Sequence, residues 1–229
     1  MLAVQDTPPH WVIWTSAVVA LVVVGSKLLW IVARNVITIA HEGGHATMAL
    51  LSGRKLSGIR LHSDTSGLTV SSGKSTGLGM VFTGLAGYVA PSLLGLGCVW
   101  LLSVSRITIL LWACILLLFG MLVFIRNIYG AASILVTGLI FAGLICFGSD
   151  AARGAFAYFA TWFLLVGGVR PVIELQKKRY WHEALDSDAD QLARITGVPG
   201  LVWVLLFGLV AVGCLGVGMA TLLPSAGKA

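Results

Sequence analysis

The sequence predicts an all-α polytopic membrane protein with about six to seven transmembrane helices and a small β-hairpin-like insertion. Three observations carry this prediction. The 229-residue chain is 58% hydrophobic and only 10% charged, whereas soluble domains carry about 25% charged residues. Its apolar residues fall into runs of the length that a bilayer-spanning helix needs. One polar segment between these runs has the alternating pattern of two short strands around a turn.

The apolar runs follow one another along the whole chain, so we expect a single domain over residues 1–229. The first run is short, and Gly25-Ser26-Lys27 barely separates it from the second, which leaves both six and seven spans open. Residues 1–10 lack the basic start of a signal peptide, so we expect the first run to be a retained anchor. The predicted helices cover residues 11–25, 28–51, 79–102, 107–125, 128–148, 154–175 and 198–222.

Two polar segments interrupt the apolar pattern. In the first, residues 52–77, the β-like runs Leu56–His62 and Leu68–Ser72 flank the turn sequence Asp64-Thr65-Ser66-Gly67, which predicts a hairpin. The second, residues 176–196, is densely charged.

The net charge of +6 is best explained by membrane topology. Basic residues collect in cytoplasmic loops, and a seven-span arrangement places most of them on one side. We therefore expect a multi-pass protein of a bacterial cell membrane, with the N-terminus and both polar segments in the cytoplasm. No basic stripe with interleaved aromatic residues is present, so nucleic acid is not an expected partner. The basic residues on the expected cytoplasmic side are Arg54, Lys55, Arg60, Lys74, Arg126, Lys177, Lys178, Arg179 and Arg194.

The sequence His41-Glu42-Gly43-Gly44-His45 fits the metal-binding pattern H-E-x-x-H. Residues four apart lie on one face of a helix, so His41 and His45 can bind one ion. Glu42 can then take a proton from water without being a ligand.

The motif lies about halfway along an apolar run, where ionisable groups are costly and usually functional. Arg34, Thr38, His41 and His45 form a polar stripe on this predicted helix. The alternative is that the two histidines only form hydrogen bonds with neighbouring helices.

A catalytic zinc site needs a third protein ligand, and the candidates are Asp186, Asp188 and Asp190. Ser187 and Asp190 form a capping box that starts a helix. Asp190 then serves the backbone and Asp186 lies outside the helix, whereas the side chain of Asp188 is free in the first turn. We favour Asp188 as the ligand. The alternative is that all three are solvated acids at a helix start.

Four features together resemble the site-2-protease-like zinc metallopeptidases of family M50, and most closely its M50B-type branch. They are HEGGH in an early membrane helix, the hairpin sequence SGLTVSSG, the glycine- and proline-containing span TGLAGYVAP, and the late sequence SDAD. The resemblance implies intramembrane proteolysis with Zn²⁺ as cofactor. It implies that His41, His45 and Asp188 are the metal ligands, that Glu42 is catalytic, and that residues 56–72 present the substrate as an added strand.

The sequence and this resemblance together predict a zinc-dependent intramembrane endopeptidase that cleaves membrane-embedded or membrane-adjacent protein segments by metal-activated water. The expected partners are the lipid bilayer and a membrane protein substrate. Arg34, Asn35 or Asn127 are candidates to stabilise the oxyanion. The alternative is a non-catalytic membrane scaffold or accessory subunit that retains a metal site. A transporter ranks last, because intramembrane charges are expected on one helix alone.

Overall fold

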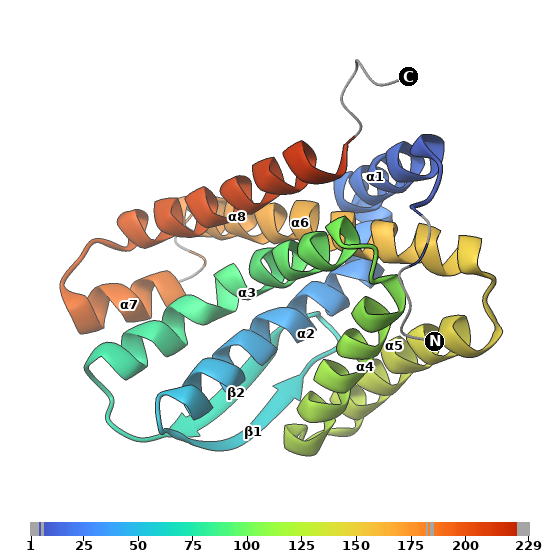
Figure 1. Ribbon diagram of the computed structural model, residues 1–229. Helices are drawn as coiled ribbons and strands as arrows, with labels where there is room; N and C mark the ends of the chain where they lie inside the picture. Colours follow the sequence, from blue (N-terminus) through green and yellow to red (C-terminus); the bar gives the residue numbers. More distant parts are fainter. Residues whose placement is uncertain (1–4, 6, 182, 184–185, 224–229) are drawn as a thin grey trace.

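A computed structural model describes residue 5, residues 7–181, residue 183 and residues 186–223. This part of the chain forms a helical bundle with one two-stranded antiparallel sheet, as predicted (Figure 1). The elements are α1 (His10–Gly25), α2 (Lys27–Leu51), β1 (Lys55–Leu61), β2 (Gly67–Ser72), α3 (Leu78–Ser103), α4 (Ile107–Phe124), α5 (Ile128–Phe147), α6 (Asp150–Tyr180), α7 (Asp188–Thr196) and α8 (Gly200–Leu222).

Five helices, α3, α4, α5, α6 and α8, are each long and apolar enough to cross a membrane. Helices α1 and α2 meet at a bend of 102° and together count as one further span at most. The described chain therefore has five or six spans, which favours the six-span alternative over seven. In α4 and α5, 17% of the residues of the apolar window are buried, as expected for helices that use lipid as their solvent.

The N-terminal segment contacts the connection between α3 and α4. The backbone N–H of Gln5 donates to Ser105 O (3.1 Å), and its side-chain oxygen accepts from the Thr108 hydroxyl (3.0 Å). These contacts fix the start of the described chain within the bundle. They do not assign a side of the membrane, so the cytoplasmic N-terminus stays a prediction.

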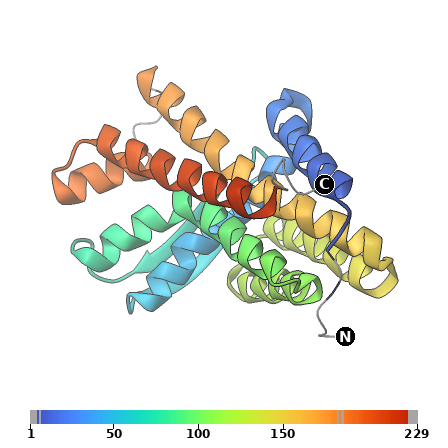
Figure 2. The same ribbon diagram turned by 45° about the horizontal axis from the view of Figure 1, so that its top comes forward.

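The centre of the bundle is formed by α2, α3, α6 and α8, with α8 running beside both α3 and α6 (Figures 1 and 2). Small residues allow these helices to approach closely, as is common in membranes. An added Cβ atom at Gly44 of α2 would lie 2.5 Å from Ala90 Cβ of α3, and one at Gly168 of α6 would lie closer than 3.0 Å to the hydroxyl of Ser92. The glycines of HEGGH thus include one required by helix packing.

The hairpin packs against α2, and β1 lies between β2 and the α4–α5 turn. Ile59 and Leu61 of β1 are fully buried and pack with Ile39 and Ala46 of α2. The outer edge of β1 is covered by the α4–α5 turn, because Arg126 N–H donates to Ile59 O (2.9 Å). The other edge of the sheet, along β2, has no strand partner within the described residues.

The charged segment after α6 ends in α7, which lies beside the start of α3 and the start of α8 (Figure 1). The hydroxyl of Ser187 accepts from Asp190 N–H and caps the helix, as the capping-box pattern predicts. Gly197 adopts a left-handed conformation with φ 74° and ends it. Leu192 is fully buried against Gly84 of α3. This packing places the first turn of α7 over the middle of α2.

We predict that Gly168→Ala destabilises the bundle by about 1–3 kcal/mol, the usual cost of overpacking a tight interface. Ser92 is fully buried and leaves no room for the added methyl group. Unfolding followed by tryptophan fluorescence in detergent micelles measures this change. The matched control is Gly97→Ala, because an added Cβ at Gly97 has no neighbour within 4 Å. Equal stability of the two variants would contradict the packing argument.

Candidate metal centre

Three of the residues predicted as ligands lie together where α2 meets α7. His41 and His45 are one turn apart on α2, and their Nε2 atoms are 3.1 Å from each other. Asp188 Oδ2 lies 3.3 Å from Nε2 of His41 and 3.2 Å from Nε2 of His45. The structure thus brings together one donor atom from each of these three side chains.

The spacing of these atoms fits a zinc ion. Zinc bonds to imidazole nitrogen and carboxylate oxygen are about 2.0–2.1 Å long, so a tetrahedral ion holds its ligand atoms about 3.3 Å apart. The three observed separations, from 3.1 to 3.3 Å, are close to the edges of such a tetrahedron. Two neutral imidazoles and one carboxylate are also a ligand set that leaves a position open, as catalytic zinc sites require.

The chain orients both imidazole rings from α3. His45 Nδ1 lies 2.7 Å from Thr83 O, and since a carbonyl oxygen only accepts, Nδ1 carries the proton and Nε2 is free to bind a metal. The ring of His41 packs edge-on against Tyr88, with centroids 4.8 Å apart. Between them, Gly87 leaves the space that the rings occupy, because a Cβ there would lie closer than 3.0 Å to both.

The two other candidate acids differ from Asp188 because each has an ion-pair partner away from the histidines. Asp190 forms an ion pair with Arg179 of α6, and Asp186 forms one with Arg194 (3.1 Å). Burial by itself would raise the pKa of the Asp188 carboxyl. His45 and His41, when protonated, more than offset this, so its pKa lies below the usual range. A metal cation at the same three side chains would favour the carboxylate form of Asp188 in the same way.

Glu42 directly follows His41 in the sequence, but its side chain points toward the hairpin. Its side chain is buried, with 4% of the residue exposed. Its Oε2 atom accepts a hydrogen bond from the Thr69 hydroxyl of β2 at 2.6 Å. A Cβ atom at Gly67 would lie 2.5 Å from Oε1 of Glu42. Sequence reasoning did not find Thr69, Gly67 or Thr83, although the hairpin pattern marked the region of the first two.

The three predicted oxyanion donors have different hydrogen-bonding surroundings. Asn127 is fully engaged with β1: its Nδ2 donates to Leu61 O (2.6 Å), and its Oδ1 accepts from Leu61 N–H (3.2 Å). These two hydrogen bonds give Asn127 a structural role in holding β1. Arg34 is directed toward Glu174 (3.7 Å). Asn35 Oδ1 is buried and has no hydrogen-bond partner among the described residues.

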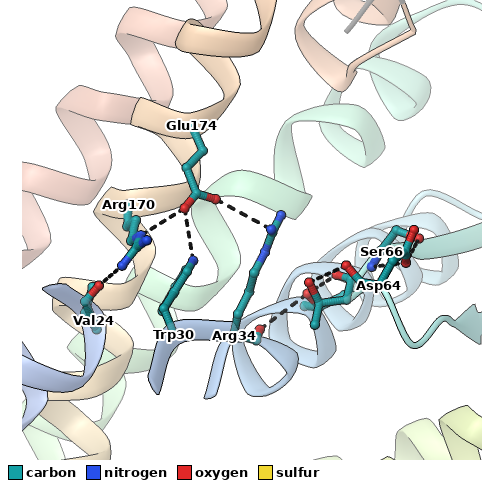
Figure 3. Close-up of polar contacts among 9 residues, drawn as sticks. Val24, Trp30, Arg34, Asp64, Ser66, Arg170 and Glu174 are labelled. Atoms are coloured by element: carbon teal, nitrogen blue, oxygen red, sulfur yellow. Dashed lines mark hydrogen bonds and ion pairs between the residues drawn. The ribbon is translucent and has the colours of Figure 1, made fainter. Parts of the chain in front are cut away.

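Arg34 belongs to a second charged cluster, centred on Glu174 of α6 (Figure 3). Glu174 Oε1 accepts from Arg170 Nε (2.8 Å) and from Trp30 Nε1 (3.0 Å), and the Arg170 guanidinium lies 4.8 Å from the centre of the Trp30 ring. Helix α6 thus contributes two charged side chains to this cluster, in addition to Arg34 of α2. Of the polar stripe of α2, Arg34 is the member whose partner lies on α6.

A cavity of about 200 Å³ lies beside this cluster. Its lining includes Arg34, Glu174, Tyr88 and Ser187. Tyr88 packs against His41, and Ser187 directly precedes Asp188. The cavity therefore has charged and polar walls and is lined by neighbours of two of the donor residues.

The fold and this site define a class of protein: a multi-pass membrane protein with a His-His-Asp group that could hold a metal ion, and with a buried glutamate in the same helical turn. A family model described as Peptidase M50B-like matches residues 14–218, and the chain belongs to this family. The match includes the three donor residues, Glu42 and the hairpin. Neither the search of curated proteins nor that of solved structures found a match.

We predict that Gly87→Ala weakens zinc binding about 10- to 100-fold, the usual effect of disturbing the groups that orient metal ligands. The added methyl group would collide with both imidazole rings. Competition with a zinc-chelating dye measures the affinity of the purified protein. Gly97→Ala, on the exposed face of the same helix, should bind zinc as the wild type does. An unchanged affinity in Gly87→Ala would show that the rings do not hold zinc in this arrangement.

Proposed function

We propose that this membrane metallopeptidase is a zinc-dependent intramembrane endopeptidase. The observation that carries the proposal is the convergence of the Nε2 atoms of His41 and His45 with Oδ2 of Asp188, within 3.3 Å, beside the buried Glu42. A zinc ion at these atoms supplies a Lewis acid that polarises the scissile carbonyl and makes water a nucleophile at neutral pH.

The remaining chemistry rests on Glu42. The water oxygen adds to the peptide carbonyl carbon while the Glu42 carboxylate accepts a proton from that water. The C–N bond then breaks, and the proton passes from Glu42 to the leaving nitrogen, so that one carboxylate serves as base and then as acid. The products are a carboxylate and an amine. The charged cavity beside His41 gives water and the polar products a space within the bundle.

The substrate we propose is a membrane protein segment bound along the free edge of β2. Adding a strand to an exposed sheet edge is a general mode of peptide recognition, with affinity supplied by main-chain hydrogen bonds. The edge lies beside Glu42, which Thr69 and Gly67 contact. A helical substrate must unwind before its backbone can pair in this way.

We further propose that the hairpin and α7 face the cytoplasm. Basic residues lie around both segments, including Lys55 and Lys74 near the hairpin and Lys177 and Lys178 before α7. Such an excess is typical of cytoplasmic loops. Cleavage would then occur close to the cytoplasmic side of the bilayer.

Metal content and hydrolysis together test the function. In protein purified without chelators, we expect about one zinc per chain in wild type and Glu42→Gln, and loss of zinc in His41→Ala and Asp188→Ala, because a catalytic site needs three protein ligands. Hydrolysis of fluorescein-labelled casein should fall about 10²- to 10⁴-fold in Glu42→Gln, the usual contribution of a general base. Mass spectrometry of bound metal and fluorescence release provide the two readouts.

Asp186→Ala is the matched control for Asp188→Ala, since its carboxyl is 88% exposed and pairs with Arg194. It should retain both zinc and activity. Zinc retained by Asp188→Ala would contradict the ligand assignment. Stoichiometric zinc without hydrolysis in any form, with casein and with membrane-embedded single-helix proteins, would favour the non-catalytic scaffold.

A further inference from the structure

The side chain of Glu42 projects from α2 and is contacted by strand β2. The Thr69 hydroxyl lies 2.6 Å from Glu42 Oε2 and 3.2 Å from the backbone oxygen of the same residue. A hydroxyl has a single proton to donate, and the shorter distance assigns it to the carboxylate. Gly67, two residues earlier on the same face of the strand, approaches the carboxylate with its backbone.

A second contact fixes the hairpin to the same helix one turn before the metal-binding motif. The Thr38 hydroxyl donates to Thr65 O at 2.8 Å. Thr65 is buried and has a φ of 65°, a conformation that is uncommon for residues other than glycine. Its neighbours complete the turn, as Asp64 Oδ1 accepts from the N–H and the hydroxyl of Ser66 (Figure 3). The hairpin is therefore held on α2 at two points, of which only Thr69 touches Glu42.

The alternation of the antiparallel ladder shows where the backbone of Thr69 points. Thr69 pairs with Ile59, and Gly67 pairs with Leu61. Ile59 O and Leu61 N–H bond outward, away from β2, to the α4–α5 turn. Residues opposite each other direct their backbone groups in the same sense, either both inward or both outward. The backbone groups of Thr69 and Gly67 therefore face the free edge of the sheet.

We infer that Thr69 is a positioning residue that couples substrate binding to the orientation of Glu42; this inference rests on the proposed function. Its hydroxyl fixes the carboxylate, while its backbone N–H and carbonyl are the groups with which an added substrate strand pairs. The same residue thus sets the register of the bound peptide relative to the base. Free rotation of Glu42 in the absence of this hydrogen bond would move its oxygens away from the water that they must deprotonate.

Thr69→Val and Thr69→Ser separate this role from a structural one. Valine keeps the shape and removes the donor, whereas serine keeps the donor. We expect Thr69→Val to lower kcat for casein about 10- to 100-fold, the range expected when a catalytic group is misplaced, with KM and zinc content unchanged. Thr69→Ser should restore kcat to within about 3-fold of wild type, because the hydrogen bond to the carboxylate is retained.

A second measurement does not depend on turnover. Acetohydroxamate binds to the metal of a catalytic zinc site and donates a hydrogen bond to a neighbouring carboxylate. Its binding to cobalt-substituted protein is followed by visible absorption. We expect Thr69→Val to weaken its binding about 10-fold, as the loss of one charge-assisted hydrogen bond predicts. Ser71→Ala is the control: Ser71 lies two residues along β2, and its hydroxyl accepts from Arg54 and does not contact Glu42.

The outcomes distinguish the inference from the function on which it rests. Wild-type kcat and hydroxamate affinity in a zinc-loaded Thr69→Val variant would overturn the positioning role alone. Loss of zinc in Thr69→Val that serine does not restore would also overturn it, since the residue would then be structural. Zinc-free wild-type protein, or a Glu42→Gln variant as active as wild type, would overturn the proposed function itself.

Discussion

The structure depends on the burial of ionisable side chains within a bundle whose outer surface is apolar. His45 and Glu42 are both buried on one helix, and such groups are tolerated at membrane depth only when polar partners meet them. Thr83 meets His45, Thr69 meets Glu42, and Asp188 meets both histidines. Each partner comes from a different element, α3, β2 and α7. The need to satisfy one turn of α2 therefore accounts for the placement of three other parts of the chain.

The charged cluster around Glu174 extends this arrangement to α6. Glu174 and Arg170 join α6 to α2 through Trp30 and Arg34, and the ion pair of Arg179 with Asp190 joins the end of α6 to α7. Asp188 is thus carried by a helix that is fixed at its first turn to α6, which is itself fixed to the helix of the two histidines. These ion pairs, together with the packing of Leu192 against Gly84, hold the third donor residue close to the first two.

Much of this could be predicted from sequence, because the relevant signals are local. The apolar runs mark the spans, the i, i+4 spacing places His41 and His45 on one face, and the capping box singles out Asp188 among three acids. The missed features are tertiary contacts. Nothing local to Thr69 indicates that it faces Glu42, and nothing local to Asn127 indicates that it pairs with Leu61. The 102° bend between α1 and α2 is likewise not visible in hydropathy, because the hydropathy of a segment does not depend on the direction of its helix.

The distance along the chain between the donors has a consequence for biogenesis. A ribosome completes the two histidines of α2 more than 140 residues before it reaches Asp188, and domains form from the N-terminus during synthesis. Until then the nascent protein carries a pair of imidazoles and a glutamate without the carboxylate that completes the set. On the proposed function, metal capture would therefore be one of the last events of assembly, after α3 to α6 have entered the bilayer. A chain that stalls earlier would then be inert, which would protect the membrane in which it is being built from premature hydrolysis.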